Sequence, residues 1–260
     1  MMLIITIIAA FLALYALWER LTGNTYHGLY FGKTKIEEKG TAIPFEGNIF
    51  MNYWVVKKAQ FSSKESVGHA VNLIAAFLMK WIKEGRIVVL PCQELGIGED
   101  GTFDDSVEEE LYSMIVDAGG EKHIISSDSF AFWAKTHSGI LAPFPARAQK
   151  HGEELLAAGG FLDKDQRPIP EAFPKVRHVI ELKNFLKDIG HSGLTPERPW
   201  EDYLVTGVLL GRGEHMRRQI SVSLPVQLSA GLDAVGSIAM GYKEAEREES
   251  MANWYQANPS

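Results

Sequence analysis

The strongest structural signal in the chain lies in residues 62–91, which read SSKESVGHAVNLIAAFLMKWIKEGRIVVLP. Ser62 and Glu65 have the spacing of a capping box, in which two side chains bond free amides at the start of a helix. The apolar residues that follow recur at the i, i+3, i+4, i+7 positions of one helix face. Gly85 supplies the left-handed residue that ends a helix, and residues 86–91 favour a short strand. We therefore predict an amphipathic helix that leads directly into a strand.

Apolar periodicity indicates more helices after this segment. A second capping box, Ser106 with Glu109, begins a helix that stops at Gly119-Gly120. Further helices are predicted over residues 128–137, 146–158, 175–189 and 200–210. Residues 41–56 are apolar and rich in β-favouring side chains, so period alone does not separate a strand from a helix there. The sequence after Ser221 predicts no definite element.

The N-terminus carries an apolar run, residues 1–18, which reads MMLIITIIAAFLALYALW. At 1.5 Å per residue, a helix of this length reaches roughly 27 Å, close to the ~30 Å hydrocarbon thickness of a bilayer. A cleaved signal peptide has a basic start and small residues before the cut, and this run has neither. A buried core helix normally has a polar stripe, which is also missing. The run predicts an uncleaved membrane anchor.

Charged residues beside this run indicate its orientation. Arg20, Lys33, Lys35 and Lys39 all follow the run, and no Lys or Arg precedes it. Lys and Arg accumulate on the cytoplasmic side of a membrane segment, whereas acidic residues have little influence. We therefore expect a single-pass protein of the cell membrane, with the bulk of the chain in the cytoplasm.

One local pattern occurs twice, at residues 63–91 and 146–163: a helix, a glycine, a short strand and a turn. Small helices closed by a β-hairpin form the winged-helix plan, in which the hairpin covers apolar surface that the helices leave exposed. We therefore predict an α+β fold, in which an N-terminal transmembrane helix precedes a mostly helical, winged-helix-like module with short β-hairpins. The predicted domains are a transmembrane anchor over residues 1–20, a juxtamembrane connector over 21–40, a winged-helix-like domain over 41–172, and a C-terminal helical segment with a tail over 173–260.

Composition restricts the class of protein. The 260 residues include 26 Lys and Arg against 33 Asp and Glu, a formal charge of −7, with 46% hydrophobic and 23% charged residues. These fractions exclude a wholly disordered or collagen-like chain. A pI near 5.7 argues against a protein whose main task is to bind nucleic acid. The one cysteine, Cys92, excludes an intramolecular disulfide and a thiolate metal cage.

Several segments together resemble a known family. They are WIKEGRIV at 81–88, SVEEELY at 106–112, ELKNFLKD at 181–188, WEDYLV at 200–205 with Gly207 and Gly211 after it, and Asn253-Trp254-Tyr255. This set resembles the cytoplasmic part of the YciQ-type predicted membrane proteins, a family described as a domain of unknown function. The resemblance covers residues 60–255 and implies a location and a fold, but no catalytic residue. The chain departs from the family plan because it lacks the export signal and the extracytoplasmic β-domain, and because Val205-Thr206 replaces a Tyr-Ala pair.

Two acidic stretches partly match ligand-binding motifs. Residues 96–101 match the G-x-G-x-x-G pattern of a dinucleotide-binding loop. Glu99 and Asp100 would place like charge against a pyrophosphate, so we expect a hairpin turn there instead. Asp100 to Asp105 lacks the register of a calcium loop and favours a solvated acidic loop.

Histidine and cysteine residues predict no metal or catalytic centre. The histidines at 123, 137 and 151 fall on different predicted elements, and no pair has the i, i+4 spacing of zinc ligands on a helix. Cys92 follows a strand and has Glu94 rather than a base nearby, which favours a buried packing thiol. We therefore expect no catalytic, cofactor-binding or metal-binding residues, and no cofactor.

A partner surface is the remaining candidate site. Basic residues punctuate the helix after Pro174 and the segment after the helix at 200–210, where they could contact anionic lipid headgroups at about 1 kcal/mol each. The helix at 128–137 has a single lysine and is expected to expose aromatic side chains, which suit a protein partner better than DNA bases. The candidate partner or lipid surface consists of Phe130, Trp133, Lys175, Arg177, Arg212, Arg217 and Arg218.

These observations predict binding without catalysis. We expect a membrane-tethered, winged-helix-like module that binds another protein, or a second copy of itself, as a scaffold. Tethering raises the local concentration of the module, so weak contacts suffice. Two alternatives stay open: a membrane-tethered DNA-binding regulator, and an enzyme with an unrecognised site.

Overall fold

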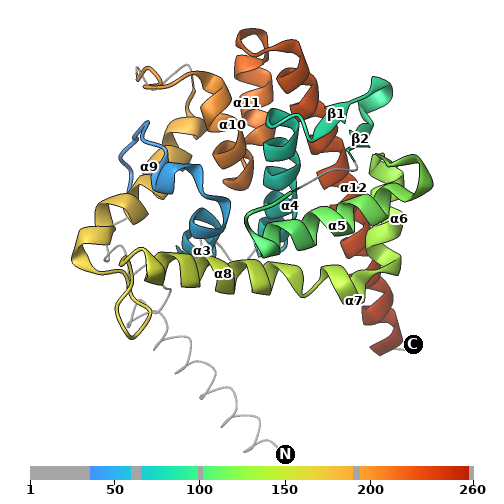
Figure 1. The fold of residues 1–260 in the computed structure, drawn as a ribbon, viewed down its shortest axis with the longest axis horizontal. Helices are drawn as coiled ribbons and strands as arrows, with labels where there is room; N and C mark the ends of the chain where they lie inside the picture. The colour runs from blue at the N-terminus through green and yellow to red at the C-terminus, as the bar shows by residue number, and fades with distance from the viewer. Residues whose placement is uncertain (1–35, 60–65, 99–101, 190–193, 258–260) are drawn as a thin grey trace, which may run out of the picture.

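The computed structural model of the chain describes residues 36–59, 66–98, 102–189 and 194–257. Figure 1 shows α4 near the centre, with α8 running across one end of the molecule and α12 along its side. The α-helices of these ranges are α3 (Ile49–Ala59), α4 (Ser66–Lys83), α5 (Ser106–Gly119), α6 (Ser127–Thr136), α7 (Ser138–Leu141), α8 (Phe144–Ala158), α9 (Phe173–Lys187), α10 (Trp200–Leu209), α11 (Gly213–Ile220) and α12 (Val226–Ala257). The strands are β1 (Ile87–Val89), β2 (Leu95–Ile97) and β3 (Ile124–Ile125), and short 3-10 turns include η1 (Pro44–Gly47) and η3 (Pro91–Gln93).

Helix α4 lies at the centre of the core because its apolar face is wide. Its residues from Val71 to Leu78 are buried apart from Asn72, and it packs against α3, α10 and α12. Its less buried polar residues, Asn72, Lys80 and Lys83, lie together on one narrow stripe, as expected of an amphipathic helix. Gly85 ends it in a left-handed conformation, with φ +76°, and β1 follows at once. The helix and strand predicted over this segment are confirmed, while Ser62 and Glu65 lie outside the described residues.

The strands form one small antiparallel sheet in the order β1-β2-β3. Val88 of β1 pairs with Gly96 of β2, which pairs in turn with Ile124 of β3. Ile87, Leu95 and Ile125 are buried, so the sheet adds one apolar face to the core. With two or three residues per strand, this sheet cannot cover the helices.

Glycines mark two close helix crossings. A Cβ on Gly152 of α8 would lie 2.2 Å from the carbonyl oxygen of Phe50 in α3. The backbones of α8 and α3 are therefore in direct contact at this glycine. A Cβ on Gly241 of α12 would lie 2.8 Å from the carbonyl oxygen of Ser127 in α6. Both crossings therefore require a residue without a side chain.

The first described residues are fixed to helix α9. Asn184 donates hydrogen bonds to the carbonyls of Ile36 and Glu38, at 3.0 and 3.1 Å. Tyr203 of α10 donates to the carbonyl of Thr41 at 2.9 Å. The chain therefore enters the described fold beside its C-terminal helices, although these are far away in sequence.

The predicted fold class is wrong. The described residues are mostly helical with one small sheet, and the second predicted hairpin is only an isolated bridge between Leu162 and Pro168. Helix α12, rather than a hairpin, packs against α4 and α6. The physical reason is length: a 32-residue helix offers far more apolar contact than strands of three residues.

Across the described ranges, none of the helices combines the length and apolar character that crossing a bilayer requires. The predicted transmembrane anchor, residues 1–20, lies outside the described residues, as does most of the predicted connector.

A buried tyrosine in α3 leads to a first prediction. Tyr53 is 1% exposed, and its hydroxyl has no hydrogen-bond partner among the described residues. Burial raises the pKa of the Tyr53 phenol well above its ordinary value of 10.0. We expect Tyr53→Phe to stabilise the protein by about 1 kcal/mol at neutral pH, because it removes an unsatisfied buried hydroxyl. Urea unfolding of the two full-length proteins measures this difference.

The sign of the pH effect follows from the raised pKa. The folded state disfavours the phenolate, so ionisation of Tyr53 favours unfolding. The free energy of unfolding is therefore unaffected by this group below pH ~10, and it declines as the pH rises above that value. Stability of the Tyr53→Phe protein should therefore fall less steeply in alkali. Tyr203→Phe is the matched control, because it removes a hydroxyl that donates to Thr41 and should destabilise by about 1 kcal/mol. Equal destabilisation by both changes would contradict the interpretation.

Candidate functional site

Two carboxylates at the start of α5 organise the polar contacts of the molecule. Asp105 is the N-cap of α5, and its Oδ1 accepts from the backbone amides of Val107 and Glu108, at 2.9 and 3.2 Å. Capping satisfies amides that the first helical turn leaves free. The sequence predicted Ser106 as the cap, in a solvated acidic loop. The cap is one residue earlier, and Asp105 is half-buried.

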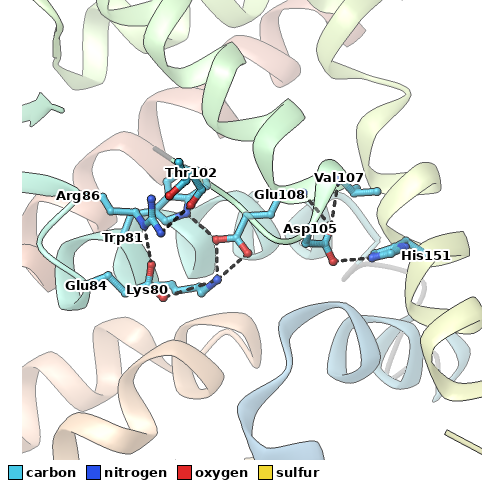
Figure 2. Close-up of polar contacts among 9 residues, drawn as sticks. All are labelled: Lys80, Trp81, Glu84, Arg86, Thr102, Asp105, Val107, Glu108 and His151. Atoms are coloured by element: carbon cyan, nitrogen blue, oxygen red, sulfur yellow. Dashed lines mark hydrogen bonds and ion pairs between the residues drawn. The ribbon is translucent and has the colours of Figure 1, made fainter. Parts of the chain in front are cut away.

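Glu108 is the buried member of this pair. The residue is 6% exposed, and both of its carboxylate oxygens lie 2.5 Å from Nζ of Lys80 in α4. The indole Nε1 of Trp81 also donates to Oε1, at 2.8 Å. Figure 2 shows the carboxylate between these two side chains. A buried carboxylate requires such partners, because desolvation otherwise disfavours its charge.

Asp105 also joins α5 to α8. Its Oδ2 lies 2.6 Å from Nε2 of His151, on the side away from Glu108 (Figure 2). The His151 ring stands edge-on to Phe50 of α3, with 4.8 Å between ring centroids. One aspartate thus fixes a helix start and, through the histidine, the meeting point of α3 and α8.

A cleft opens beside these carboxylates. Its volume is about 630 Å³, within the range of about 300–1,000 Å³ that is typical of ligand sites. It lies among η1, the start of α3, α4, the start of α5, and the region of Phe161 and Lys175. Its lining consists of Phe45, Glu46, Gly47, Asn48, Ile49, Phe50, Met51, Phe77, Lys80, Asp105, Glu108, Phe161 and Lys175.

One wall of the cleft is a strained turn. Phe45 and Glu46 have φ angles of 48° and 54°, values that bulky residues rarely adopt. Buried Asn52 holds the turn, because its Nδ2 donates to the carbonyls of Pro44 at 3.0 Å and Asn48 at 2.8 Å. Strained backbone that surrounding bonds hold in place is concentrated at functional sites.

Beside this turn, the cleft carries a lysine on an aromatic ring. Nζ of Lys175 lies 4.6 Å from the centroid of Phe161, and the Phe161 ring meets Phe45 edge-on at 5.7 Å. A cation over a ring face is attracted by the ring quadrupole. Among the described residues, no carboxylate forms an ion pair with Lys175. The cleft therefore combines aromatic walls with an available positive charge.

The polar groups of the cleft lining are mostly charged side chains with partners. Within its described lining, the cleft has no serine, threonine, cysteine or histidine that could act as a nucleophile or a proton shuttle. The oxygens of Asp105 and Glu108 are already engaged by amides, His151, Lys80 and Trp81. In the part of the chain that the structure describes, no three His, Cys, Asp or Glu side chains are grouped as metal ligands.

The two aromatic residues predicted for the partner surface are not exposed. Phe130 is fully buried and Trp133 is almost so, because α12 covers this face of α6 and Tyr242 packs beside Phe130. Trp133 also donates from Nε1 to Asp117 at 2.7 Å. The prediction that they form a surface is wrong. The exposed aromatic of α6 is Phe132, at 71%.

Of the two predicted basic residues on α9, Arg177 is held by acidic neighbours. Arg177 bonds Glu181 one turn later and Glu38 in the entering segment, each at 2.7 Å. These hydrogen bonds raise the pKa of Arg177 above its ordinary value. Lys175, by contrast, lines the cleft. Of these two, only Lys175 is left with a charge that a ligand could neutralise.

The predicted basic residues of α11 form an acid–base network. Arg217 bonds Glu214 at 2.8 Å and Asp233 of α12 at 3.0 Å. Its hydrogen bond with Glu214 raises the pKa of Arg217, and the same bond lowers the pKa of Glu214. Arg218 lies 3.3 Å from Glu214, while Arg212 precedes α11 with its Nε buried. Arg217 is therefore engaged by two carboxylates, and Arg218 shares one of them.

Cys92 differs from its prediction. Its side chain is exposed rather than buried, because Cys92 and Gln93 form the tip of the β1–β2 hairpin with φ angles of 64° and 62°. Two left-handed residues in succession match the twist of a hairpin. A turn was predicted at Gly96–Gly101. Gly96 and Ile97 lie in β2 instead, and residues 99–101 are outside the described ranges.

Sequence reasoning missed most of this cleft. Lys80 and Glu108 belong to helices separated by the hairpin, and His151 lies on a third helix. The acidic start of α5 carried a signal, since Asp105 precedes an apolar helix in the position of an N-cap. Nothing in the sequence pairs it with His151.

No family model matches this chain, and no curated protein or solved structure matches it. The resemblance to YciQ-type membrane proteins stays a prediction.

Proposed function

We propose that the chain is a non-catalytic interaction protein whose cleft binds a short segment of a partner protein or of a second copy. The observation that carries this proposal is the cleft itself, which combines aromatic walls, a clamped strained turn and a lysine that has no ion-pair partner among the described residues. Its volume of about 630 Å³ accommodates a few side chains rather than a domain face. Such an anchor site gives specificity to a contact that is otherwise weak.

We further propose that this binding takes place at the cytoplasmic face of a membrane. The apolar sequence of residues 1–18 and the basic residues after it support this location. The segment that follows joins the fold on α9, where Asn184 holds it. Tethering would raise the local concentration of membrane partners.

The cleft supports neither of the two alternative functions, a DNA-binding regulator or an enzyme. A DNA-binding role needs available Lys and Arg, and Arg177 and Arg217 are each engaged by two carboxylates. Catalysis by a serine, threonine, cysteine or histidine needs such a side chain in the cleft, and its described lining contains none.

Site-directed photocrosslinking in native membranes tests the proposed function. Benzoylphenylalanine replaces Met51, a half-buried residue that lines the cleft, in the full-length chain. We expect a discrete adduct with one protein, and mass spectrometry should map it to one short segment of that protein. The matched control carries the same group at Gln219, an exposed residue of α11. Identical adducts from both positions, or adducts from neither, would refute a binding cleft at this place.

A further inference from the structure

Most charges in the cleft already have partners. Its ionisable side chains are Glu46, Lys80, Asp105, Glu108 and Lys175. Lys80 and Glu108 neutralise each other at 2.5 Å. Asp105 accepts two backbone amides on one oxygen and His151 on the other. These three groups therefore offer little to a ligand.

Two opposite charges remain in the cleft lining, on different elements. Lys175 of α9 contacts the Phe161 ring, and Glu46 lies in the strained turn of η1. Both residues are exposed, and neither forms an ion pair with any residue in the described ranges. A bound segment would satisfy both by carrying one acidic and one basic group.

The cleft lining also contains aromatic side chains. Phe45 meets Phe161 at 5.7 Å, and Phe50 meets Phe77 at 5.1 Å, as ring-centroid distances. Met51 adds a thioether to the same lining. Aromatic side chains pack favourably against ring edges and against sulfur.

We propose that the cleft recognises a partner segment in which one aromatic side chain lies between an acidic and a basic residue. The acidic residue pairs with Lys175, the basic residue pairs with Glu46, and the aromatic ring enters between Phe50 and Phe161. This inference rests on the proposed function and specifies the chemistry of the partner. Charge complementarity selects this segment over a purely apolar one.

Short peptides test the inference directly. The probes are acetylated, amidated tripeptides Glu-Phe-Lys and Lys-Phe-Glu, with versions that carry Gln in place of either charged residue or Ala in place of Phe. Calorimetric titration into the detergent-solubilised full-length chain measures their affinities. We expect one of the two orders to bind best, each Gln version to bind about threefold more weakly, and the Ala version to bind least. Raising the salt concentration should reduce the charge-dependent differences.

Variants assign each charge to its partner. With Lys175→Met, the peptide with the acidic residue should lose its advantage over its Gln version, while the preference for the basic residue stays. Glu46→Gln should give the reverse pattern. Lys164→Met, at an exposed lysine outside the cleft lining, should leave every preference unchanged. Circular dichroism verifies that each variant folds.

The inference is overturned if the charged and Gln versions bind equally to the unaltered protein, or if Lys175→Met weakens all peptides alike. That result differs from failure of the proposed function. A Met51 adduct that persists without any peptide preference would retain the binding cleft and reject only this specificity.

Discussion

Replacing Gly152 by alanine is expected to destabilise the protein by about 3 kcal/mol, the upper end of the usual range for overpacking. The added Cβ would lie 2.2 Å from the carbonyl oxygen of Phe50 and 2.7 Å from its carbonyl carbon. These are backbone atoms of α3, so no side-chain rotation relieves the clash. Helices α3 and α8 must move apart, which also disturbs the contacts of His151 with Phe50 and Asp105. Urea unfolding of the full-length chain measures the loss.

The same substitution at Gly236 provides the control. Gly236 lies inside α12, and a Cβ there would have no neighbour within 4 Å. Alanine is the better helix former, so Gly236→Ala should stabilise by about 0.5–1 kcal/mol. A small or favourable effect of Gly152→Ala would show that α3 and α8 do not cross as closely as the structure indicates.

Local sequence signals located elements whose ends are chemically marked. Gly85 ends α4, and Ser126 caps α6 at the place where a helix was expected. Residues 41–56 were ambiguous because their side chains suit both a strand and a buried helix. Burial of Phe50 and Trp54 on α3 explains why that segment has no polar stripe.

Helix α12 was missed for a physical reason. Its first half contains three glycines, which in sequence resemble loop residues. In the structure, Gly231 faces Ile82 of α4 and Gly241 faces Ser127 of α6, so these glycines permit close packing. Whether a glycine breaks a helix or admits a neighbour depends on tertiary contacts that local periodicity does not contain.

The same helix explains the error at Phe130 and Trp133. Their spacing places them on one face of α6, and sequence alone could not show that α12 covers that face. The cleft was hidden in a similar way. Lys175 was selected for its charge, but its neighbour Phe161 belonged to a segment predicted as a strand, and Glu108 and Lys80 belonged to separate helices.

Replacing Glu108 by alanine is expected to destabilise by about 3 kcal/mol, the lower end of the range for breaking a buried ion pair. Two donors lose their acceptor: Nζ of Lys80 and the buried indole Nε1 of Trp81. The lower end applies because the Lys80 side chain is 32% exposed and has Glu84 at 3.6 Å as a second partner. Urea unfolding at neutral pH measures this difference.

Comparison with Lys80→Met separates the two contacts of Glu108. That change leaves a carboxylate whose side chain is 8% exposed and which retains only the Trp81 donor. It should therefore destabilise at least as much as Glu108→Ala.

In the double variant Lys80→Met/Glu108→Ala, the loss of stability should be smaller than the sum of the single losses, because the second change removes a charge that the first has left without its partner. Additive losses would mean that Lys80 and Glu108 contribute independently, and the carboxylate beside the cleft would then owe its position to Trp81 and the cap of α5.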